Sequence, residues 1–251
     1  MDPKKLRANT RNFVQLLMDN AAKPRSWSIK QAADTATLWI YDVIGGLFGG
    51  VDAQQVAREL AALDVSTINV RINSPGGDVF DARAIATALR QHSARVVAQV
   101  DGWAASAAST IAMAADEILI ADGGFLMIHN AWTIALGNKN DMLDTAALLD
   151  NIDGAIAKDY IARTGASAEQ VQAWMDAETW FAAQDAVDAG LADSVIAQPA
   201  GSQSAAGNWN LAAYRNAPHV PDQDPAPESR RPLPHRELLE KRLALFERNP
   251  A

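Results

Sequence analysis

Residues 96–112 are VVAQVDGWAASAASTIA. The apolar half of this stretch, up to Gly102, predicts a buried β-strand, and the run of small residues after it predicts a helix over 104–115. A serine on the first turn of that helix, Ser106, would carry its hydroxyl above the edge of the sheet, close to unpaired backbone N–H groups. This is the logic of a nucleophile elbow, although the motif G-x-S-x-G is absent. The alternative is that Ser106 only caps a buried helix.

Strand and helix signals alternate on both sides of this stretch. The expected strands cover residues 36–44, 67–72, 95–100, 117–120 and 125–128. The other expected helices cover residues 53–63, 82–89 and 141–163, and Gly165 is a natural stop for the last one. Strands that alternate with helices predict right-handed βαβ units on a largely parallel sheet, which is an α/β fold.

Composition divides the chain into four segments. Residues 1–30 are a basic N-terminal arm, and residues 31–198 contain the alternating elements and form the expected domain. Eight of the eleven prolines lie at or beyond position 199, so residues 199–235 are expected to be a flexible linker. Residues 236–251 predict a short amphipathic helix that docks on a partner, with a frayed tail as the alternative.

The bulk composition excludes several classes of protein. With 251 residues, 49% of them hydrophobic, the chain can bury one sizeable core. The formal charge of −8 argues against a nucleic-acid partner, which would need a basic face. The lack of cysteine excludes a disulfide scaffold and a thiolate nucleophile. No apolar stretch is long enough to span a membrane and no secretory signal is recognisable, so we expect a soluble, cytoplasmic protein.

Two further motifs are absent from the sequence. There is no G-x-x-x-x-G-K-[ST], the motif of a phosphate-binding loop, so the chain cannot power protein unfolding itself. The glycine-rich residues 44–50, IGGLFGG, lack the lysine that a nucleotide site needs, and we expect them to form a mobile rim loop instead. There is no H-E-x-x-H, and the two histidines of the domain are far apart in sequence, so we expect neither a metal nor a cofactor.

Histidine is scarce in the predicted domain, where only His92 and His129 occur. His92 follows an amphipathic helix, a position typical of a solvated helix end. His129 ends the apolar run 125–129, FLMIH, so its imidazole should lie at the mouth of a buried strand. Opposite a serine at a helix start, His129 is a candidate general base. The alternative is a hydrogen-bonded core histidine.

A glycine-rich turn supplies the third candidate feature. Residues 73–78 are NSPGGD, between a predicted strand and a predicted helix whose cap would be Asp78. Two adjacent glycines permit backbone conformations closed to other residues, so that N–H groups can approach a substrate. A pair of such donors is what an oxyanion hole requires. The alternative is an ordinary surface turn.

Taken together, three motifs resemble the Clp protease proteolytic subunit family of serine peptidases. They are INSPGG at 72–77, GWAAS at 102–106 and MIH at 127–129, in the family's order and at nearly its spacings. The resemblance extends over about two thirds of the chain, from Leu38 to Val195. Each motif is weak alone, but the set is specific.

The resemblance implies a fold, a site and an assembly. The fold is a Clp protease/crotonase-like spiral of βαβ units with a long protruding helix. The nucleophile maps to Ser106, its base to His129, and the oxyanion donors to the backbone N–H groups of Gly77 and Ala107. The family acts on protein and peptide substrates as a ring-forming homo-oligomer, and the helix at 141–163 takes the place where rings pair.

The acid of the triad is the part that departs from the family. Residues 181–193, FAAQDAVDAGLAD, are similar to the family's end, and its acid lies shortly before them. Here residues 174–181 are WMDAETWF, which is one residue shorter and lacks the family's arginine. We assign the acid to Asp176, with Glu178 as the alternative, to orient the imidazole. A solvated acidic turn is the other interpretation of this segment.

A narrower resemblance suggests a biological role. VRINSPGGDVFDA at 70–82 and DAETWF at 176–181 are similar to the Clp-related head-maturation proteases of tailed phages and prophages. This implies an ATP-independent serine endopeptidase that cleaves scaffold and capsid proteins, in the host cytoplasm or inside an immature head.

Several other functions compete with this one. A general cytoplasmic Clp-like peptidase would share the site. A crotonase-like acyl-CoA enzyme would share the fold but would need neither Ser106 nor His129. A relative of the signal-peptide peptidases would use a Ser–Lys pair, but no motif ties Lys139 or Lys158 to the serine. A head-assembly protein could keep the fold without activity, which the altered acid segment favours.

Overall fold

The computed structural model describes residues 27–45, 49–197, 209, 211 and 214–218. Among these the strands are β1 (Trp27–Ala32), β2 (Thr35–Ile40), β3 (Thr67–Ser74), β4 (Arg95–Ala105), β5 (Glu117–Ala121), β6 (Phe125–Ile128), β7 (Thr179–Ala182) and β8 (Ser194–Ile196). The helices are α2 (Ala53–Ala61), α3 (Val79–Gln91), α4 (Ala107–Ala112), α5 (Lys139–Thr164), α6 (Ala168–Asp176) and α7 (Ala183–Asp188). Strand β1 begins inside the predicted arm, and the expected C-terminal helix lies outside the described residues.

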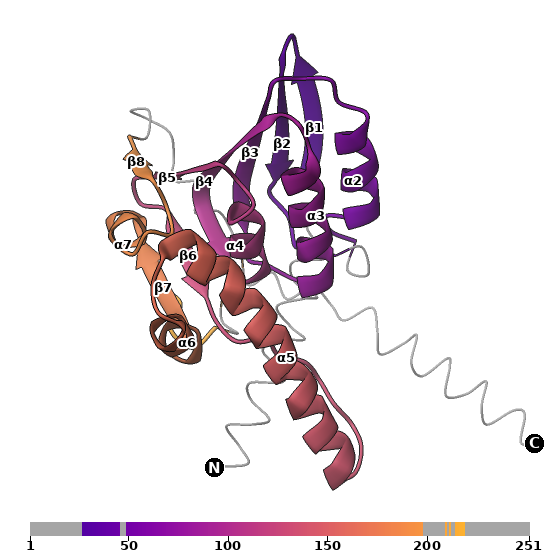
Figure 1. The fold of residues 1–251 in the computed structure, drawn as a ribbon, viewed down its shortest axis with the longest axis vertical. Helices are drawn as coiled ribbons and strands as arrows, with labels where there is room; N and C mark the ends of the chain where they lie inside the picture. The colour runs from indigo at the N-terminus through magenta and orange to yellow at the C-terminus, as the bar shows by residue number, and fades with distance from the viewer. Residues whose placement is uncertain (1–26, 46–48, 198–208, 210, 212–213, 219–251) are drawn as a thin grey trace, which may run out of the picture. The chain divides into compact units, whose positions relative to one another are not determined.

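The main sheet follows the order β1-β2-β3-β4-β5-β8. Strands β2, β3, β4, β5 and β8 are parallel, and β1 is antiparallel to β2 at one edge. Helix α2 connects β2 to β3, α3 connects β3 to β4, and α4 connects β4 to β5. Figure 1 shows α2 and α3 packed side by side against the sheet. The predicted α/β architecture is confirmed.

The sheet divides along β4. Residues 97–100 of β4 pair with β5, whereas residues 103–105 pair with residues 125–127 of β6. Strand β6 then pairs with β7 in the antiparallel sense. The prediction of a helix from Ala104 onward was therefore wrong at its start. Hydrogen bonding to β6 keeps these small residues extended as far as Ala105, which outweighs their helix propensity.

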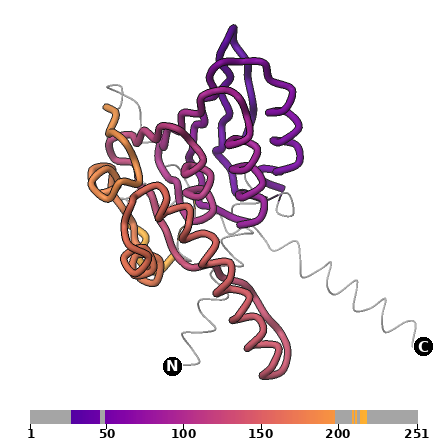
Figure 2. Tube along the Cα trace, in the orientation of Figure 1, coloured from indigo at the N-terminus to yellow at the C-terminus, as the bar shows by residue number. Residues whose placement is uncertain are grey.

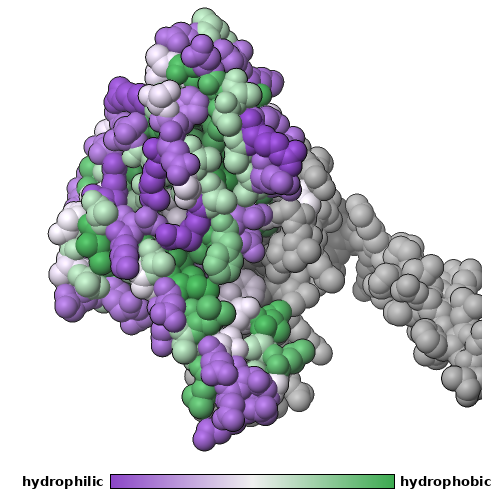
Figure 3. All heavy atoms as spheres, turned by 45° about the vertical axis from the view of Figure 1, so that its right-hand side comes forward, coloured by the Kyte–Doolittle hydropathy of each residue, from purple (hydrophilic) through white to green (hydrophobic). Residues whose placement is uncertain are grey.

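Helix α5 is the long helix predicted near 141–163 and extends beyond the rest of the described domain (Figure 1). Asn138 and Asp141 form a capping box at its start, and Gly165 ends it in the left-handed conformation at φ 69°. The chain between β6 and α5 runs beside the first half of the helix (Figure 2). In Figure 3, green apolar residues gather in the lower half of the molecule among purple polar residues.

One cluster of buried side chains joins the sheet to the helices, and it includes α5 through Ile156 and Tyr160. The second half of α5 is therefore anchored in the core while its first half is exposed. No helix within the described ranges has an apolar run long enough to cross a membrane.

Candidate active site

Ser106 occupies the junction between β4 and α4 in a conformation that serine rarely adopts, with φ 54° and ψ −124°. Its backbone N–H donates to the carbonyl of Met127 at 2.9 Å, which fastens the turn to β6. Its side chain makes no capping hydrogen bond to α4. Instead, Oγ lies 2.7 Å from Nε2 of His129. The capping alternative is thus not what the geometry shows.

His129 follows the end of β6, and the pairing of β6 with β4 explains its position. Met127 is the register partner of Ala105, so the residues just beyond both strand ends meet. Burial lowers the pKa of the His129 imidazole to about 4, so the ring is neutral at neutral pH. In a neutral imidazole, Nε2 can accept the proton of the Ser106 hydroxyl, which assigns the single N–H proton of the ring to Nδ1.

The predicted acid Asp176 does not contact the imidazole. Its side chain is exposed, and its Oδ1 accepts hydrogen bonds from Asn130 at 2.7 Å and from Gln172 at 2.8 Å. These bonds lower the pKa of Asp176. Within the described residues, no hydrogen bond joins His129 to any carboxylate, and its hydrogen-bond partner is Ser106.

The two residues after His129 tie it to the helices. Asn130 donates to Asp176 at the end of α6, and the Ala131 N–H donates to Asp153 of α5 at 2.6 Å. The alternative acid, Glu178, accepts from the Asn216 N–H at 2.8 Å. Both predicted carboxylates therefore stabilise backbone segments around the histidine.

The glycine turn lies directly against the serine. Gly76 has φ 96°, and a Cβ added there would meet the Ala105 carbonyl oxygen at 2.7 Å and the Ser106 Cβ at 2.8 Å. Gly77 has φ 149°, and its Cβ would meet the Ile44 carbonyl oxygen at 2.0 Å. Only glycine fits this close approach. It brings Gly76 beside the start of α4, where an added Cβ would lie 3.1 Å from the Ala107 nitrogen.

The amides of Gly77 and Ala107 are the predicted oxyanion donors. In the described part of the chain, neither N–H donates to a protein acceptor. By contrast, Gly76 N–H donates to the Ser74 hydroxyl at 3.2 Å, and Asp78 N–H donates to the Ile44 carbonyl at 2.8 Å. Gly77 and Ala107 line the same pocket as Ser106, so both unused donors lie at the edge of the candidate site.

The segment expected to be a mobile rim loop takes part in this support. Ile44 N–H donates to the Gly76 carbonyl at 2.9 Å, and Gly45 N–H donates to the Val51 carbonyl at 3.0 Å. Both ends of the loop are therefore hydrogen-bonded, and its tip at 46–48 lies outside the described residues.

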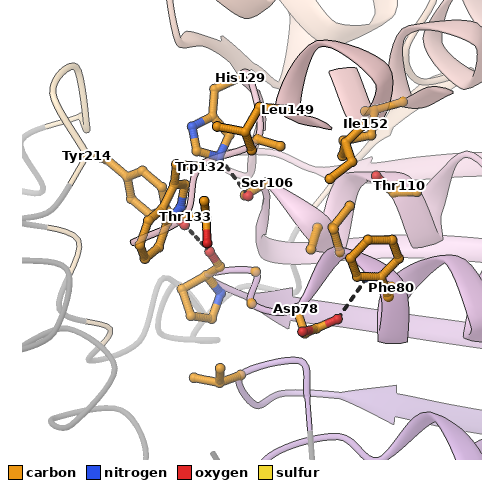
Figure 4. A pocket seen from close by; sticks show the side chains of 18 of the residues that line it. Asp78, Phe80, Ser106, Thr110, His129, Trp132, Thr133, Leu149, Ile152 and Tyr214 are labelled. Carbon is orange, nitrogen blue, oxygen red and sulfur yellow. Dashed lines mark hydrogen bonds between the residues drawn. The ribbon is translucent and has the colours of Figure 1, made fainter. Parts of the chain in front are cut away.

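A cavity of about 400 Å³ opens beside Ser106 and His129. Its walls come from the glycine turn, the start of α4, the segment after β6, α5 and Tyr214 (Figure 4). Leu149, Ile152 and Ile156 of α5 make much of the wall apolar. The described residues contain no group of three or more side chains suited to a metal. Because of its α5 wall, the cavity has an apolar side next to Ser106.

Sequence reasoning missed Tyr214, which it assigned to the flexible linker. The described part of that segment packs against the site: Tyr214 is buried with Ala105 and Met127, and its ring stands edge-on to His129 at 5.6 Å between centroids. Trp209 Nε1 donates to the Asn73 carbonyl at 3.2 Å. Two aromatic residues within a polar, proline-rich segment were the available signal.

Comparison with known protein families matches residues 43–199, more than half of the chain, to the family described as Clp protease. The chain belongs to the Clp protease family. Membership confirms the resemblance drawn from the three motifs and identifies a family of peptidases. Tyr214 lies beyond the matched residues, so it is a part of this site that the family match does not cover.

Individual relatives agree with this membership. The ATP-dependent Clp protease proteolytic subunit 1 of Protochlamydia amoebophila is 28% identical over 152 residues, which are 57% of this chain and 74% of the relative. The ATP-dependent Clp protease proteolytic subunit of Bacteroides fragilis is 30% identical over 131 residues, 51% of this chain and 63% of the relative. The match thus leaves more than a third of that subunit uncovered.

A solved Clp structure has the same fold. A mutant of ClpP1 from Listeria monocytogenes superposes with a TM-score of 0.57 at 25% identity, covering 64% of this chain and 91% of that one. The predicted Clp-like spiral fold with its long helix is therefore confirmed.

Proposed function

We propose that this chain is a serine endopeptidase with Ser106 as nucleophile and His129 as its base. The observation that carries the proposal is the 2.7 Å approach of Ser106 Oγ to Nε2 of His129 beside two unused backbone amides. A crotonase-like acyl-CoA enzyme would need no such pair, so this approach counts against that alternative.

The reaction follows from the arrangement. Ser106 Oγ attacks the scissile carbonyl carbon while its proton passes to Nε2 of His129, and the Gly77 and Ala107 N–H groups hold the oxyanion. The C–N bond then breaks, and His129 returns the proton to the leaving amine. Water, deprotonated by His129, hydrolyses the acyl-enzyme and restores the serine.

The third member of the predicted triad, Asp176, acts differently in this geometry. It holds Asn130, the residue after His129, and so steadies the segment that presents the imidazole. A direct role at the imidazole would require the Asp176 carboxylate to leave Asn130 and Gln172.

The cavity indicates the substrate class. Its apolar α5 wall continues into exposed apolar residues at the rim, including Phe80 at 62% and Ile134 at 53% exposure. Exposed apolar surface beside a catalytic pair favours binding of unfolded polypeptide with an apolar side chain next to the cleaved bond. We therefore propose protein and peptide substrates.

The narrower role is cleavage of phage scaffold and capsid proteins without an ATPase, in the host cytoplasm or an immature head. Its support is the likeness of residues 70–82 and 176–181 to head-maturation proteases and the lack of a phosphate loop in the sequence. Co-expression with scaffold and capsid proteins tests this role. Uncleaved partners, from a preparation that hydrolyses peptides, would leave the general cytoplasmic peptidase as the better description.

A serine-directed fluorophosphonate tests the central proposal. It should label the purified chain, and Ser106→Ala should abolish labelling, whereas the exposed-site variant Ser93→Ala should label normally. Labelling that survives Ser106→Ala rejects the nucleophile assignment.

A second candidate is a head-assembly protein without activity. It is favoured by one observation: within the described residues the His129 ring lacks the carboxylate partner of a complete triad. The same probe separates the two candidates, because an inactive protein would remain unlabelled.

A further inference from the structure

The segment around Tyr214 closes one side of the candidate site from outside the region matched to the Clp family. Tyr214 is 8% exposed and packs against both His129 and Trp180. The ring centroids of Tyr214 and Trp180 are 5.7 Å apart. Asn216 holds the segment in place, since its Nδ2 donates to the Ala177 carbonyl at 2.7 Å. The aromatic ring is thus fixed from two sides.

The Tyr214 hydroxyl reaches the glycine turn. It donates to the carbonyl of Pro75, in the same peptide plane as the N–H of Gly76. That N–H donates to Ser74, so the plane is held at both ends. The next peptide carries the Gly77 N–H, the proposed oxyanion donor. The Gly76 carbonyl in that next peptide accepts from Ile44 N–H at 2.9 Å, so Tyr214 and Ile44 together hold the two peptide planes that set the direction of this donor.

The Tyr214 ring also faces the proposed base. Within the described residues, His129 has one hydrogen bond, to Ser106, and one ring contact, to Tyr214. Burial raises the pKa of the Tyr214 hydroxyl, and its interaction with the Ser106 side chain partly offsets this by lowering it. Figure 4 shows Tyr214 beside Ser106 and His129 at the edge of the cavity, which stays open. Tyr214 therefore forms a wall of the cavity and does not fill it.

We propose that Tyr214 is a positioning residue of the active site, which orients the glycine turn through its hydroxyl and the imidazole through its ring. The proposal rests on the proposed peptidase function and deepens it: the catalytic pocket is complete only when Tyr214 is docked against it. The family domain alone, without this segment, would present a looser oxyanion turn and a more solvated histidine.

The nearby charged groups do not explain the state of His129. Asp153 of α5 bonds Ala131, Asp176 of α6 bonds Asn130, and Glu178 before β7 bonds Asn216. Desolvation is the cause that lowers the His129 pKa. Since the Tyr214 ring supplies part of that burial, its removal should raise the histidine pKa.

Three variants test the proposal: Tyr214→Phe, which keeps the ring, Tyr214→Ala, which removes it, and the control Arg215→Ala at the exposed neighbouring position. We expect Tyr214→Phe to slow fluorophosphonate labelling about tenfold, the effect of one lost hydrogen bond, with an unchanged pH profile. Tyr214→Ala should slow labelling about 100-fold. The pH below which this variant loses reactivity should rise from about 4 toward the ordinary histidine pKa of 6.5. Arg215→Ala should match the parent.

A second measurement does not depend on activity. NMR titration of isotopically labelled histidine, assigned with His129→Gln, should give a raised His129 pKa in Tyr214→Ala and not in Tyr214→Phe. Thermal unfolding identifies any variant that fails to fold, and Tyr214→Phe keeps the packing. If Ser106→Ala keeps its label, the peptidase proposal fails while the NMR result still decides the role of Tyr214. An unmoved His129 pKa in Tyr214→Ala, or faster labelling, which would mean that the segment obstructs the site, overturns the positioning role.

Discussion

The Oγ atom of Ser106 meets Nε2 of His129 at 2.7 Å from a serine backbone at φ 54° and ψ −124°. Surrounding contacts hold this rare conformation: Ser106 N–H bonds Met127, and its carbonyl accepts the Ser109 hydroxyl at 2.6 Å. Backbone strain of this kind persists only where neighbours over-determine it. Here it aims the hydroxyl away from α4 and at the imidazole.

The strain predicts an unusual order of stability between two inactive variants. Ser106→Gly should be more stable than Ser106→Ala by about 1 kcal/mol, because glycine adopts positive φ freely and alanine does not. Urea unfolding of both variants measures the difference. In ordinary helix or strand positions alanine is the more stable of the two. An alanine variant of equal or greater stability would show that the turn carries no strain.

The buried imidazole predicts the pH dependence of the site. Because the His129 pKa is about 4, the parent should react with fluorophosphonate at a constant rate from neutral pH to about pH 5 and lose reactivity as pH falls through about 4. Labelling rates measured across this pH range give the midpoint at which reactivity is lost. A midpoint near 6.5 would mean that the imidazole is solvated or paired with a carboxylate.

The same burial predicts a loss of stability in acid. The folded-state pKa of His129 lies below the unfolded value of 6.5, so between these values the unfolded chain binds more protons. The free energy of unfolding should fall by up to about 3 kcal/mol as pH drops from 6.5 to 4, and His129→Gln should lack this share. Parallel pH series of urea unfolding measure it. Identical slopes in both proteins would contradict the burial of a neutral imidazole.

Asp176 offers a direct test of the third group. An acid that orients the imidazole is worth about 10⁴ in rate, whereas a group acting through Asn130 should be worth about tenfold or less. We expect Asp176→Asn to show the smaller loss in labelling rate, because asparagine keeps one acceptor oxygen. Glu178→Gln is the matched variant for the alternative acid. A loss near 10⁴ in either would identify that residue as a triad acid reached by rearrangement.

The glycine turn predicts a clash-dependent loss of activity. Gly76→Ala should cost at least about 100-fold in labelling rate, because its Cβ would press on Ala105 and Ser106. Gly123→Ala is the control: Gly123 also has positive φ, at 80°, but a Cβ there meets nothing within 4 Å. The control should lose about 1 kcal/mol of stability and no activity. Equal activity losses would show that positive φ, and not contact with the serine, matters.

The exposed start of α5 predicts self-association. Leu136, just before the helix, is 93% exposed, and Leu143 and Leu148 on α5 are 57% and 55% exposed. Together they form an apolar surface that a second copy could cover. Sedimentation should show an oligomer that Leu143→Asp weakens. Gln91→Asp, which adds the same charge at the end of α3, should assemble normally. A monomeric parent would contradict the homo-oligomer that the family resemblance implies.

The elements with strong local signals were predicted closely. The predicted cap of α3, Asp78, is confirmed, since its carboxylate accepts from the N–H groups of Phe80 and Asp81; the predicted range of 82–89 began three residues late. Strand β6 was predicted with its observed bounds, since an apolar run between turn residues is unambiguous there. The start of α4 was predicted wrongly, because β4 ends where its pairing with β6 ends and helix propensity does not decide this point.

From the sequence by itself came the α/β class and the long helix, since periodic apolar patterns encode them locally. The pairing of Ser106 with His129 was implied by the family resemblance, and the contact of β4 with β6 produces it. Only tertiary structure decided that Asp176 turns to Asn130 and that Tyr214 stands against His129. These outcomes depend on which distant segments compete for the same polar atoms and the same buried volume. Such competition leaves no periodic signal in the chain.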